Sequence, residues 1–264
     1  MKQGITLGIT KLFLAGLLLL AAGCSLLPEQ IDTTKDWTAN RLYSEAKSAM
    51  NDGDYEIAIK YFESLQARYP FGRYAQQAQL ELIYAYYKDD EPASAVAAAD
   101  RFIKLHPRHP FVDYAYYLKG LANFNQSKGL WERYLPQDPT QRDPGAARQS
   151  FQDFAELANR FPSSKYTQDA TQRMAYLRNN LAQYEVNVAK YYMKREAYVA
   201  AANRAKYVVE NYPRTPAVPD ALGVMARAYK IMGIDDLSAD ALRVLELNQP
   251  NHPDIAAVKA LVVK

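Results

Sequence analysis

The sequence has little of what disulfide-bonded or metal-centred proteins need. Cys24 is the only cysteine among 264 residues, and there are three histidines. One cysteine excludes an intramolecular disulfide in any compartment. Of the histidines, His106 and His109 adjoin prolines in one turn and His252 stands alone, with no further cysteine to complete a metal site. We therefore expect no metal and no cofactor.

Sequence motifs of common enzymes are also missing. The chain has no Gly-x-Ser-x-Gly elbow and no glycine-rich loop followed by Lys-Ser or Lys-Thr. The neighbouring acids Asp89, Asp90 and Glu91 could suggest a glycosidase pair. Asp235 and Asp236 stand at the corresponding turn of a later repeat, however, which favours solvated turn residues. We expect a protein that is not an enzyme.

The charge balance gives no support for nucleic-acid binding. The formal net charge is +3, but Lys2 and Lys11 precede Cys24 and no acid does, so subtracting these two charges leaves +1 for the remainder. A nearly neutral chain has no broad basic field to attract phosphate backbones.

The first 23 residues have the layout of an export signal. Lys2 and Lys11 come before an acid-free apolar run, Leu12–Ala22. A membrane-spanning helix needs about 20 apolar residues, and this run is too short. We therefore expect residues 1–23 to be a signal peptide that is removed.

The end of that run resembles a lipobox, the motif cut before a diacylglycerol-modified cysteine. It reads Leu20-Ala21-Ala22-Gly23-Cys24, with Ala21 where leucine is usual, and Ser25 follows where aspartate would favour inner-membrane retention. The resemblance implies a lipid anchor on Cys24 and an outer-membrane location, with the body on the periplasmic side. Stable anchoring needs at least two acyl chains, which such lipidation supplies. The alternative is an incidental cysteine in an ordinary signal.

Five prolines reveal an internal repeat. Each closes an apolar helical pattern, as helices usually end at or before the residue that precedes a proline. The residue twelve places before each proline is small, and the residue five places before is apolar. The prolines are Pro70, Pro107, Pro162, Pro213 and Pro250; the small residues are Ala58, Ala95, Ser150, Ala201 and Ser238; the apolar ones are Leu65, Phe102, Leu157, Val208 and Leu245.

This spacing resembles the tetratricopeptide repeat, a helical hairpin of 34 residues. We expect an all-α fold with five such hairpins forming a superhelical solenoid in two halves. A tether over residues 24–39 precedes an N-terminal half, residues 40–162, with three repeats and an insertion at about 126–145. Repeats four and five form the other half, residues 163–264. The alternative is one regular superhelix.

The 21 tyrosines cluster in the first helices of repeats, as in the pairs Tyr86–Tyr87, Tyr116–Tyr117 and Tyr191–Tyr192. Neighbours in a helix point about 100° apart. One tyrosine of each pair must then pack between repeats while the other faces a groove or solvent. Exposed tyrosines would enrich a binding surface.

Several segments together resemble the BamD (ComL/YfiO) family of lipoproteins, which serves the machinery that inserts β-barrels into the outer membrane. They are Arg68-Tyr69-Pro70-Phe71-Gly72, Gln76-Gln77-Ala78-Gln79-Leu80, Leu82-Ile83-Tyr84-Ala85-Tyr86-Tyr87-Lys88, His109-Pro110 with Asp113-Tyr114, and Arg142-Asp143-Pro144. The resemblance implies a scaffold that binds unfolded outer-membrane β-barrel proteins through N-terminal repeats. It also implies that C-terminal repeats bind the periplasmic domains of BamA and accessory Bam lipoproteins.

The resemblance also implies binding residues. Those expected to bind substrate are Tyr69, Phe71, Arg73, Tyr74, Gln77, Tyr84 and Tyr87. Those expected to bind protein partners are Arg204, Tyr229 and Arg243. Arg204 lies in the segment Tyr198–Glu210, and its alternative interpretation is a solvated helix residue. Two other functions stay open: a general envelope adaptor with the same fold, and a competence lipoprotein associated with peptidoglycan.

Overall fold

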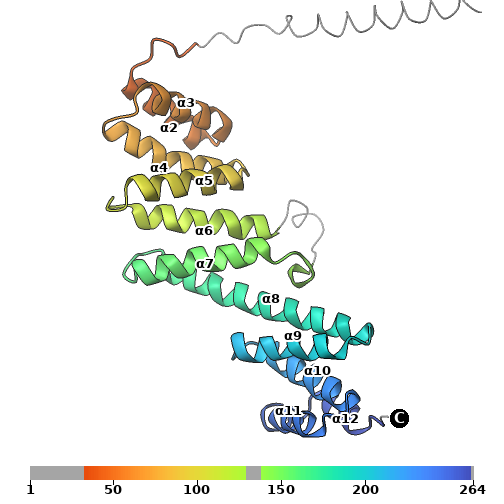
Figure 1. Ribbon diagram of the computed structural model, residues 1–264. Coiled ribbons are helices and arrows are strands. Elements are labelled where there is room, and N and C mark those ends of the chain that lie inside the picture. The colour runs from red at the N-terminus through yellow and green to blue at the C-terminus, as the bar shows by residue number, and fades with distance from the viewer. Residues whose placement is uncertain (1–32, 129–137, 263–264) are drawn as a thin grey trace, which may run out of the picture. The chain divides into compact units, whose positions relative to one another are not determined.

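A computed structural model of the chain describes residues 33–128 and 138–262 (Figure 1). It divides into two compact units, residues 1–38 and 39–264, which we describe separately. In the first unit, residues 33–36 form a turn, and the Trp37 amide donates to the carbonyl of Thr34 at 2.9 Å. Cys24, Ser25 and the signal segment lie outside the described residues, so the expectations for them stay predictions.

The described residues of the second unit form eleven α-helices and one short 3₁₀ helix, with no strand. Using the labels of Figure 1, they are α2 (Ala39–Asp52), α3 (Tyr55–Arg68), α4 (Arg73–Lys88), α5 (Pro92–Leu105), α6 (Val112–Lys128), η2 (Pro139–Gln141), α7 (Gly145–Arg160), α8 (Thr167–Lys194), α9 (Tyr198–Asn211), α10 (Val218–Ile231), α11 (Asp235–Asn248) and α12 (Pro253–Lys259).

The helices are arranged as five hairpins in chain order (Figure 1). Each helix from α2 to α11 packs against the next. The first helices of neighbouring hairpins are also in contact, for example α4 with α6 and α8 with α10. The last short helix, α12, packs mainly on α10. The prediction of an all-α helical-repeat solenoid is confirmed.

The second helix of every hairpin ends two residues before its proline, as predicted. In each case the residue between them donates its amide to a carbonyl four residues back, for example Tyr69 to Leu65 and Phe161 to Leu157, both at 2.8 Å. The proline that follows cannot continue this ladder because it has no N–H. The turns inside hairpins use left-handed backbone, with Gly53 at φ +84° and Gly233 at +71°.

The small and apolar repeat positions form the core between helices. All five small residues and all five apolar ones are buried. Where serine replaces alanine, its hydroxyl finds a backbone acceptor: Ser150 Oγ donates to the Gly120 carbonyl at 2.9 Å, and Ser238 Oγ to that of Ala226 at 2.8 Å. Buried hydroxyls need such partners, so serine is tolerated here without an unsatisfied group.

Ala58→Leu and Ala201→Leu are expected to destabilise the protein by about 1–3 kcal/mol each, because a larger side chain would overpack fully buried contacts between paired helices. Urea unfolding followed by circular dichroism measures this. Ala97→Leu, at an exposed alanine of α5, is the control and should change stability by less than about 0.5 kcal/mol. Unchanged stability in both core variants would contradict the repeat register.

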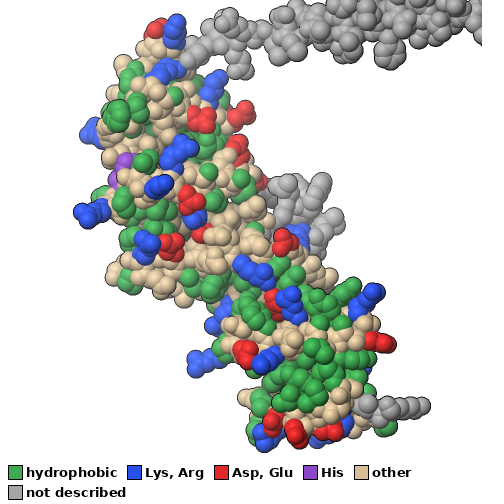
Figure 2. All heavy atoms as spheres, viewed as in Figure 1, with side chains coloured by type: hydrophobic (Ala, Val, Ile, Leu, Met, Phe, Trp, Pro, Cys, Tyr) green, Lys and Arg blue, Asp and Glu red, His purple; other side chains and the backbone are tan. Residues whose placement is uncertain are grey.

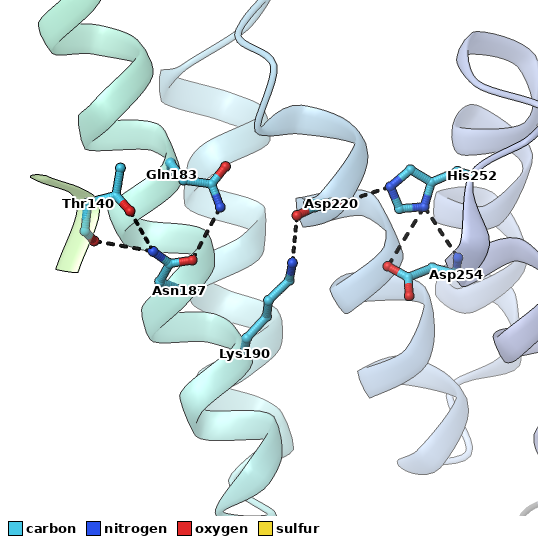
Figure 3. Close-up of polar contacts among 7 residues, drawn as sticks. All are labelled: Thr140, Gln183, Asn187, Lys190, Asp220, His252 and Asp254. Atoms are coloured by element: carbon cyan, nitrogen blue, oxygen red, sulfur yellow. Dashed lines mark hydrogen bonds and ion pairs between the residues drawn. The ribbon is translucent and has the colours of Figure 1, made fainter. Parts of the chain in front are cut away.

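The excess length of repeats three and four lies in different places. In repeat four it forms a single continuous helix, α8, of 28 residues. In repeat three, the described part of the predicted insertion contains η2, which α8 holds through Asn187: its side-chain amide donates to Thr140 Oγ1 at 2.9 Å and to the Thr140 carbonyl at 3.2 Å (Figure 3). The division into two halves near residue 162 stays a prediction.

Candidate functional site

Four of the seven residues expected to bind substrate share one stripe of α4. Arg73, Gln77, Tyr84 and Tyr87 are separated by 4, 7 and 3 residues, which at 3.6 residues per turn keeps them within about 40° of one direction. Arg73 and Gln77 are exposed, and the two tyrosines are half-buried. At 1.5 Å per residue the stripe is about 21 Å long, the span of some six residues of an extended peptide.

The C-terminal end of this stripe is an aromatic cluster. The Tyr84 ring lies 6.4 Å from that of Tyr55 and 6.5 Å from that of Tyr87, and the Lys88 ammonium lies 5.6 Å from the centre of the Tyr55 ring. Burial raises the pKa of Tyr84; Lys88 lowers it, and Tyr55 and Tyr87 raise it, with a net upward shift. The Tyr84 hydroxyl therefore stays protonated at neutral pH.

Tyr74 points from the stripe toward α2. Its ring lies 5.5 Å from that of Tyr43, and its hydroxyl donates to Asn40 Oδ1 at 3.3 Å. The Arg73 guanidinium lies 5.2 Å from the centre of the Tyr74 ring, a cation–π distance. Tyr74 therefore positions Arg73 and joins α4 to α2.

Tyr69 and Phe71 lie in the connection between α3 and α4. Tyr69 is 38% exposed and Phe71 is 90% exposed. A phenylalanine with this exposure contributes almost no burial to folding, so its apolar surface is free for contact with another molecule. The seven candidates thus divide into a helix stripe, a supporting tyrosine and a loop, and they do not converge on one pocket.

The expected division is clear in one tyrosine pair, Tyr191–Tyr192, whereas both members of Tyr116–Tyr117 pack against the core. Tyr116 is buried, while its neighbour Tyr117 is half-buried, stacks on Tyr166 with centroids 4.7 Å apart and donates to Asp169. Tyr192 packs against the core of repeat four, while Tyr191 is 57% exposed.

Arg204, expected to contact BamA, is bound to a buried carboxylate. Its guanidinium contacts Glu185 Oε2 at 2.9 Å, and Arg148 contacts the other oxygen, Oε1, at 2.8 Å. The Glu185 side chain is 1% exposed, whereas both arginine side chains are nearly half exposed. The bond and charge of Glu185 raise the pKa of Arg204 above its ordinary value. Arg204 is therefore neither purely structural nor a freely solvated residue.

The other two expected partner residues lie in repeat five. Tyr229 is half-buried on α10, and Arg243 is exposed on α11, where it pairs with Asp240 at 2.8 Å. Beside Arg243, α11 exposes Leu237, Val244 and Leu247; Figure 2 shows hydrophobic side chains gathered over the C-terminal helices of this unit. Exposed apolar residues that share a region with a charged one suit a protein contact.

One cluster of potential metal ligands was not anticipated from the sequence. In the part of the chain that the structure describes, side-chain atoms of Asp220, His252 and Asp254 lie within 4.8 Å of one another (Figure 3). His252 Nδ1 accepts the Asp254 amide at 3.3 Å, so the ring proton is on Nε2, which donates to Asp220 Oδ1 at 3.1 Å. Lys190 binds the other Asp220 oxygen at 2.5 Å.

These contacts give the cluster a structural role, because they link α8, α10 and the start of α12. Burial alone would raise the pKa of Asp220, but hydrogen bonds from Lys190 and His252, together with the charge of Lys190, outweigh it and lower the pKa. A cation here would have to compete with the Lys190 ammonium and break the His252 cap. The cluster therefore gives no argument for a metal.

The sequence contained a signal for Glu185 that motif searching does not use. Leu181 and Ala189, one turn before and after it, are buried, so helical periodicity places residue 185 on the apolar side of α8. A carboxylate in such a position needs cations nearby. Which arginines supply them could not be derived, because Arg148 and Arg204 are 37 and 19 residues away.

None of the described helices combines the length and hydropathy that a membrane crossing requires.

Comparison with known proteins places the chain in a family. A family model described as an outer membrane lipoprotein, YfiO, matches residues 35–245. The outer membrane protein assembly factor BamD of Neisseria meningitidis serogroup B is 49% identical over 220 residues, covering 83% of this chain and 82% of the relative. The protein of that name from Vibrio cholerae serotype O1 is 39% identical over 237 residues, covering 89% and 97%. A solved kinesin light chain of TPR-like repeats from Podosopora anserina has a TM-score of 0.39 at 12% identity, covering 83% and 93%.

The matched region includes four complete hairpins and most of the fifth, and with them the α4 stripe and the Glu185 cluster. Relatives near 40–50% identity align over most of both chains, so the family resemblance seen in the sequence is confirmed. The chain therefore belongs to the YfiO family of outer membrane lipoproteins.

Proposed function

We propose that the protein is a non-enzymatic scaffold of the β-barrel assembly machinery, held at the periplasmic face of the outer membrane by lipid on Cys24. The first helices of its N-terminal repeats receive unfolded β-barrel proteins. Its C-terminal repeats bind the periplasmic domains of BamA and accessory lipoproteins. The observation that carries the proposal is the α4 stripe with the exposed Phe71, within a chain closely related to outer membrane protein assembly factors.

The stripe suits an extended peptide that ends in an aromatic residue and a carboxylate. Arg73 offers a guanidinium for the terminal carboxylate, and the exposed Phe71, two residues before it, offers ring surface for the adjoining aromatic side chain. Tyr84 and Tyr87, about 21 Å further along α4, offer ring surface and hydroxyl donors for side chains some six residues earlier in the peptide. Apolar contacts would supply affinity, and the single cation would set the direction in which the peptide lies. A receptor that passes its client onward must also release it, so we expect weak, exchanging complexes. A nanomolar complex that does not exchange would contradict this role.

Phe71→Ala is expected to weaken binding of a β-barrel C-terminal peptide by about three- to tenfold while changing stability by less than about 0.5 kcal/mol, because its ring is 90% exposed. Fluorescence polarisation with the labelled peptide measures the affinity. Phe111→Ala is a matched control: Phe111 is 58% exposed and precedes α6 as Phe71 precedes α4. Equal losses in both variants would contradict a specific role for Phe71.

Arg73 has its own test within the same assay. If its guanidinium binds the terminal carboxylate, amidating the peptide C-terminus lowers affinity for the wild-type protein but not for Arg73→Ala. An amidation effect of the same size in both proteins would place the carboxylate elsewhere.

On the partner side, Arg204 presents half of its side chain to solvent above Glu185, within a helix whose Val199 and Tyr207 are also exposed. A guanidinium already positioned by a carboxylate loses little conformational freedom on binding, which favours a contact of useful strength. An acidic group of BamA beside an apolar one would complement this surface.

Arg204→Ala is expected to reduce capture of the BamA periplasmic domains by at least fivefold in a pull-down with matched protein amounts. Arg148→Ala is the control, because Arg148 binds the same carboxylate from α7. Reduced capture with Arg204→Ala alone supports direct contact. Equal reductions with both variants would mean that capture depends on neutralisation of Glu185 and not on contact with Arg204 itself. Full capture with both variants would contradict the proposal that BamA binds at Arg204.

A further inference from the structure

The outer side of the second helices carries a groove that the proposed function does not use. It lies between α3 and α5 over α4 and has a volume of about 530 Å³. We call it the outer groove. Its α3 wall is Glu63, Gln66, Ala67 and Pro70; its floor is Gln79, Leu82 and Tyr86; its α5 wall is Ser94, Ala97, Ala98, Arg101 and Phe102. Such a volume is within the roughly 300–1,000 Å³ of ligand pockets in proteins.

Side-chain size at three repeat positions explains why the hollow occurs here. Ser94, Ala97 and Ala98 stand 13, 10 and 9 places before the proline of repeat two. At the same three positions, every other repeat has at least two residues larger than alanine. Repeat four, for example, has Asn203 and Arg204 at the second and third of these positions. Repeat two alone therefore has only small residues at these three positions, which face the groove.

Two residues on the groove walls, Gln66 and Arg101, have side-chain donors without a described acceptor. The side-chain nitrogen of Gln66, Nε2, is buried and has no hydrogen-bond partner among the described residues. A buried unpartnered amide costs about 1–3 kcal/mol, a cost that an acceptor on a bound molecule would remove if the Gln66 side chain turned toward the groove. On the facing wall Arg101 is exposed and forms no ion pair with any described carboxylate. Arg101 thus presents a cation to the groove, and Gln66 would present a donor once its side chain turns toward the groove.

Two acceptors on the groove lining are already engaged. Tyr86 donates to Glu63 Oε1 at 2.6 Å, and Gln79 Oε1 lies 2.9 Å from His106 Nε2. The exposed guanidinium of Arg101 favours an occupant that brings a carboxylate, and the Gln66 amide, when turned toward the groove, favours one that brings a carbonyl oxygen. Between them Leu82, Ala97 and Ala98 form an apolar surface that fits a side chain of moderate size.

We propose that the outer groove binds an extended segment of a partner protein that carries an aliphatic side chain next to an aspartate or glutamate. The aliphatic group fills the hollow over Leu82, the carboxylate pairs with Arg101, and a backbone carbonyl accepts from the Gln66 amide after that side chain turns toward the groove. The α4 stripe that we propose for unfolded substrates projects from the opposite side of the same helix: Tyr84 and Tyr86 are two positions, or about 200°, apart. Both segments could therefore bind at once.

A phage-displayed library of random twelve-residue peptides tests this proposal. The library is first depleted on the Ala97→Trp variant, in which the indole fills the groove, and is then selected on the purified full-length protein. We expect peptides in which Leu, Ile or Val adjoins Asp or Glu. In fluorescence polarisation their affinity should fall at least tenfold with Ala97→Trp and less than twofold with Ala93→Trp, an exposed alanine of α5 outside the groove. Circular dichroism checks that both variants fold.

Arg101→Gln adds a chemical test. It should weaken a selected acidic peptide at least threefold and leave its Asn or Gln counterpart unchanged. Phe71→Ala should leave these affinities within twofold, which separates the groove from the proposed substrate site. Failure to enrich any peptide sensitive to Ala97→Trp, or enrichment of peptides without acids, would overturn the proposal. Loss of binding with Phe71→Ala but not with Ala97→Trp would overturn it as well.

Discussion

Replacing Arg148 and Arg204 together by alanine is expected to destabilise the protein by about 3 kcal/mol, more than the two single replacements combined. Each single variant leaves Glu185 one arginine and loses about 1 kcal/mol, the typical net value of a hydrogen bond. The double variant leaves a 1% exposed carboxylate without a cation. Removing every partner of a buried charge costs about 3–5 kcal/mol, and the low end applies because truncating two half-exposed arginines admits water.

Urea unfolding of the four proteins in this cycle gives the coupling free energy, which should be about 1 kcal/mol beyond additivity. Adding Glu185→Gln to the double variant is the decisive control, since a neutral amide needs no counter-charge and should recover much of the loss. Strictly additive single effects, or a triple variant no more stable than the double, would mean that water already screens Glu185 in the native protein.

The same carboxylate links stability to the proposed partner site. Glu185 belongs to α8, Arg148 to α7 and Arg204 to α9, so one residue joins three consecutive helices. A BamA carboxylate that approached Arg204 would compete with Glu185 for the guanidinium, while Arg148 would keep the buried charge compensated. Because two arginines bind the Glu185 carboxylate, Arg204 could bind a partner while Arg148 still compensates the buried charge of Glu185.

Local patterns were enough to predict the helices and the buried positions of this fold. Prolines set the helix ends because a missing N–H and a steric clash act within a few residues. The small residues, such as Ala58, and the apolar ones, such as Leu65, were predicted to lie on one stripe because helix periodicity depends on nothing distant. These features are local, so one sequence suffices for them.

The site depended on distances along the chain that no local pattern contains. Family resemblance suggested Tyr74 and Tyr84 as members of one set, but packing turns Tyr74 toward Tyr43 on α2 and Tyr84 toward Tyr55 on α3. The outer groove was missed because it results from residues that are small in repeat two alone, and a search for shared positions discards such differences. The tie through Asp220 joins residues 30 and 32 apart.

Phe154→Ala is expected to cost about 3–5 kcal/mol, the largest loss for any single replacement discussed for this protein. The ring is fully buried between α6 and α7, with the Tyr117 ring 6.2 Å away and the Phe124 ring 6.5 Å away. Removing it sacrifices apolar burial and leaves a cavity that the packed helices can close only in part. Urea unfolding measures the loss, and Phe111→Ala, at an exposed ring, should cost less than about 0.5 kcal/mol.

Gly120 lies against the Phe154 ring, and it supplies a sharper test. A Cβ atom at Gly120 would lie 2.5 Å from Cδ1 and Cε1 of Phe154, so Gly120→Ala alone should destabilise the protein by about 1–3 kcal/mol. In the Phe154→Ala background the clash is gone, the methyl group fills part of the cavity, and alanine is about 1 kcal/mol more favourable than glycine inside a helix. The same substitution should then stabilise the protein. A change of sign between the two backgrounds requires direct contact of the two residues, whereas destabilisation of similar size in both would show that Gly120 is needed for a reason other than the Phe154 ring.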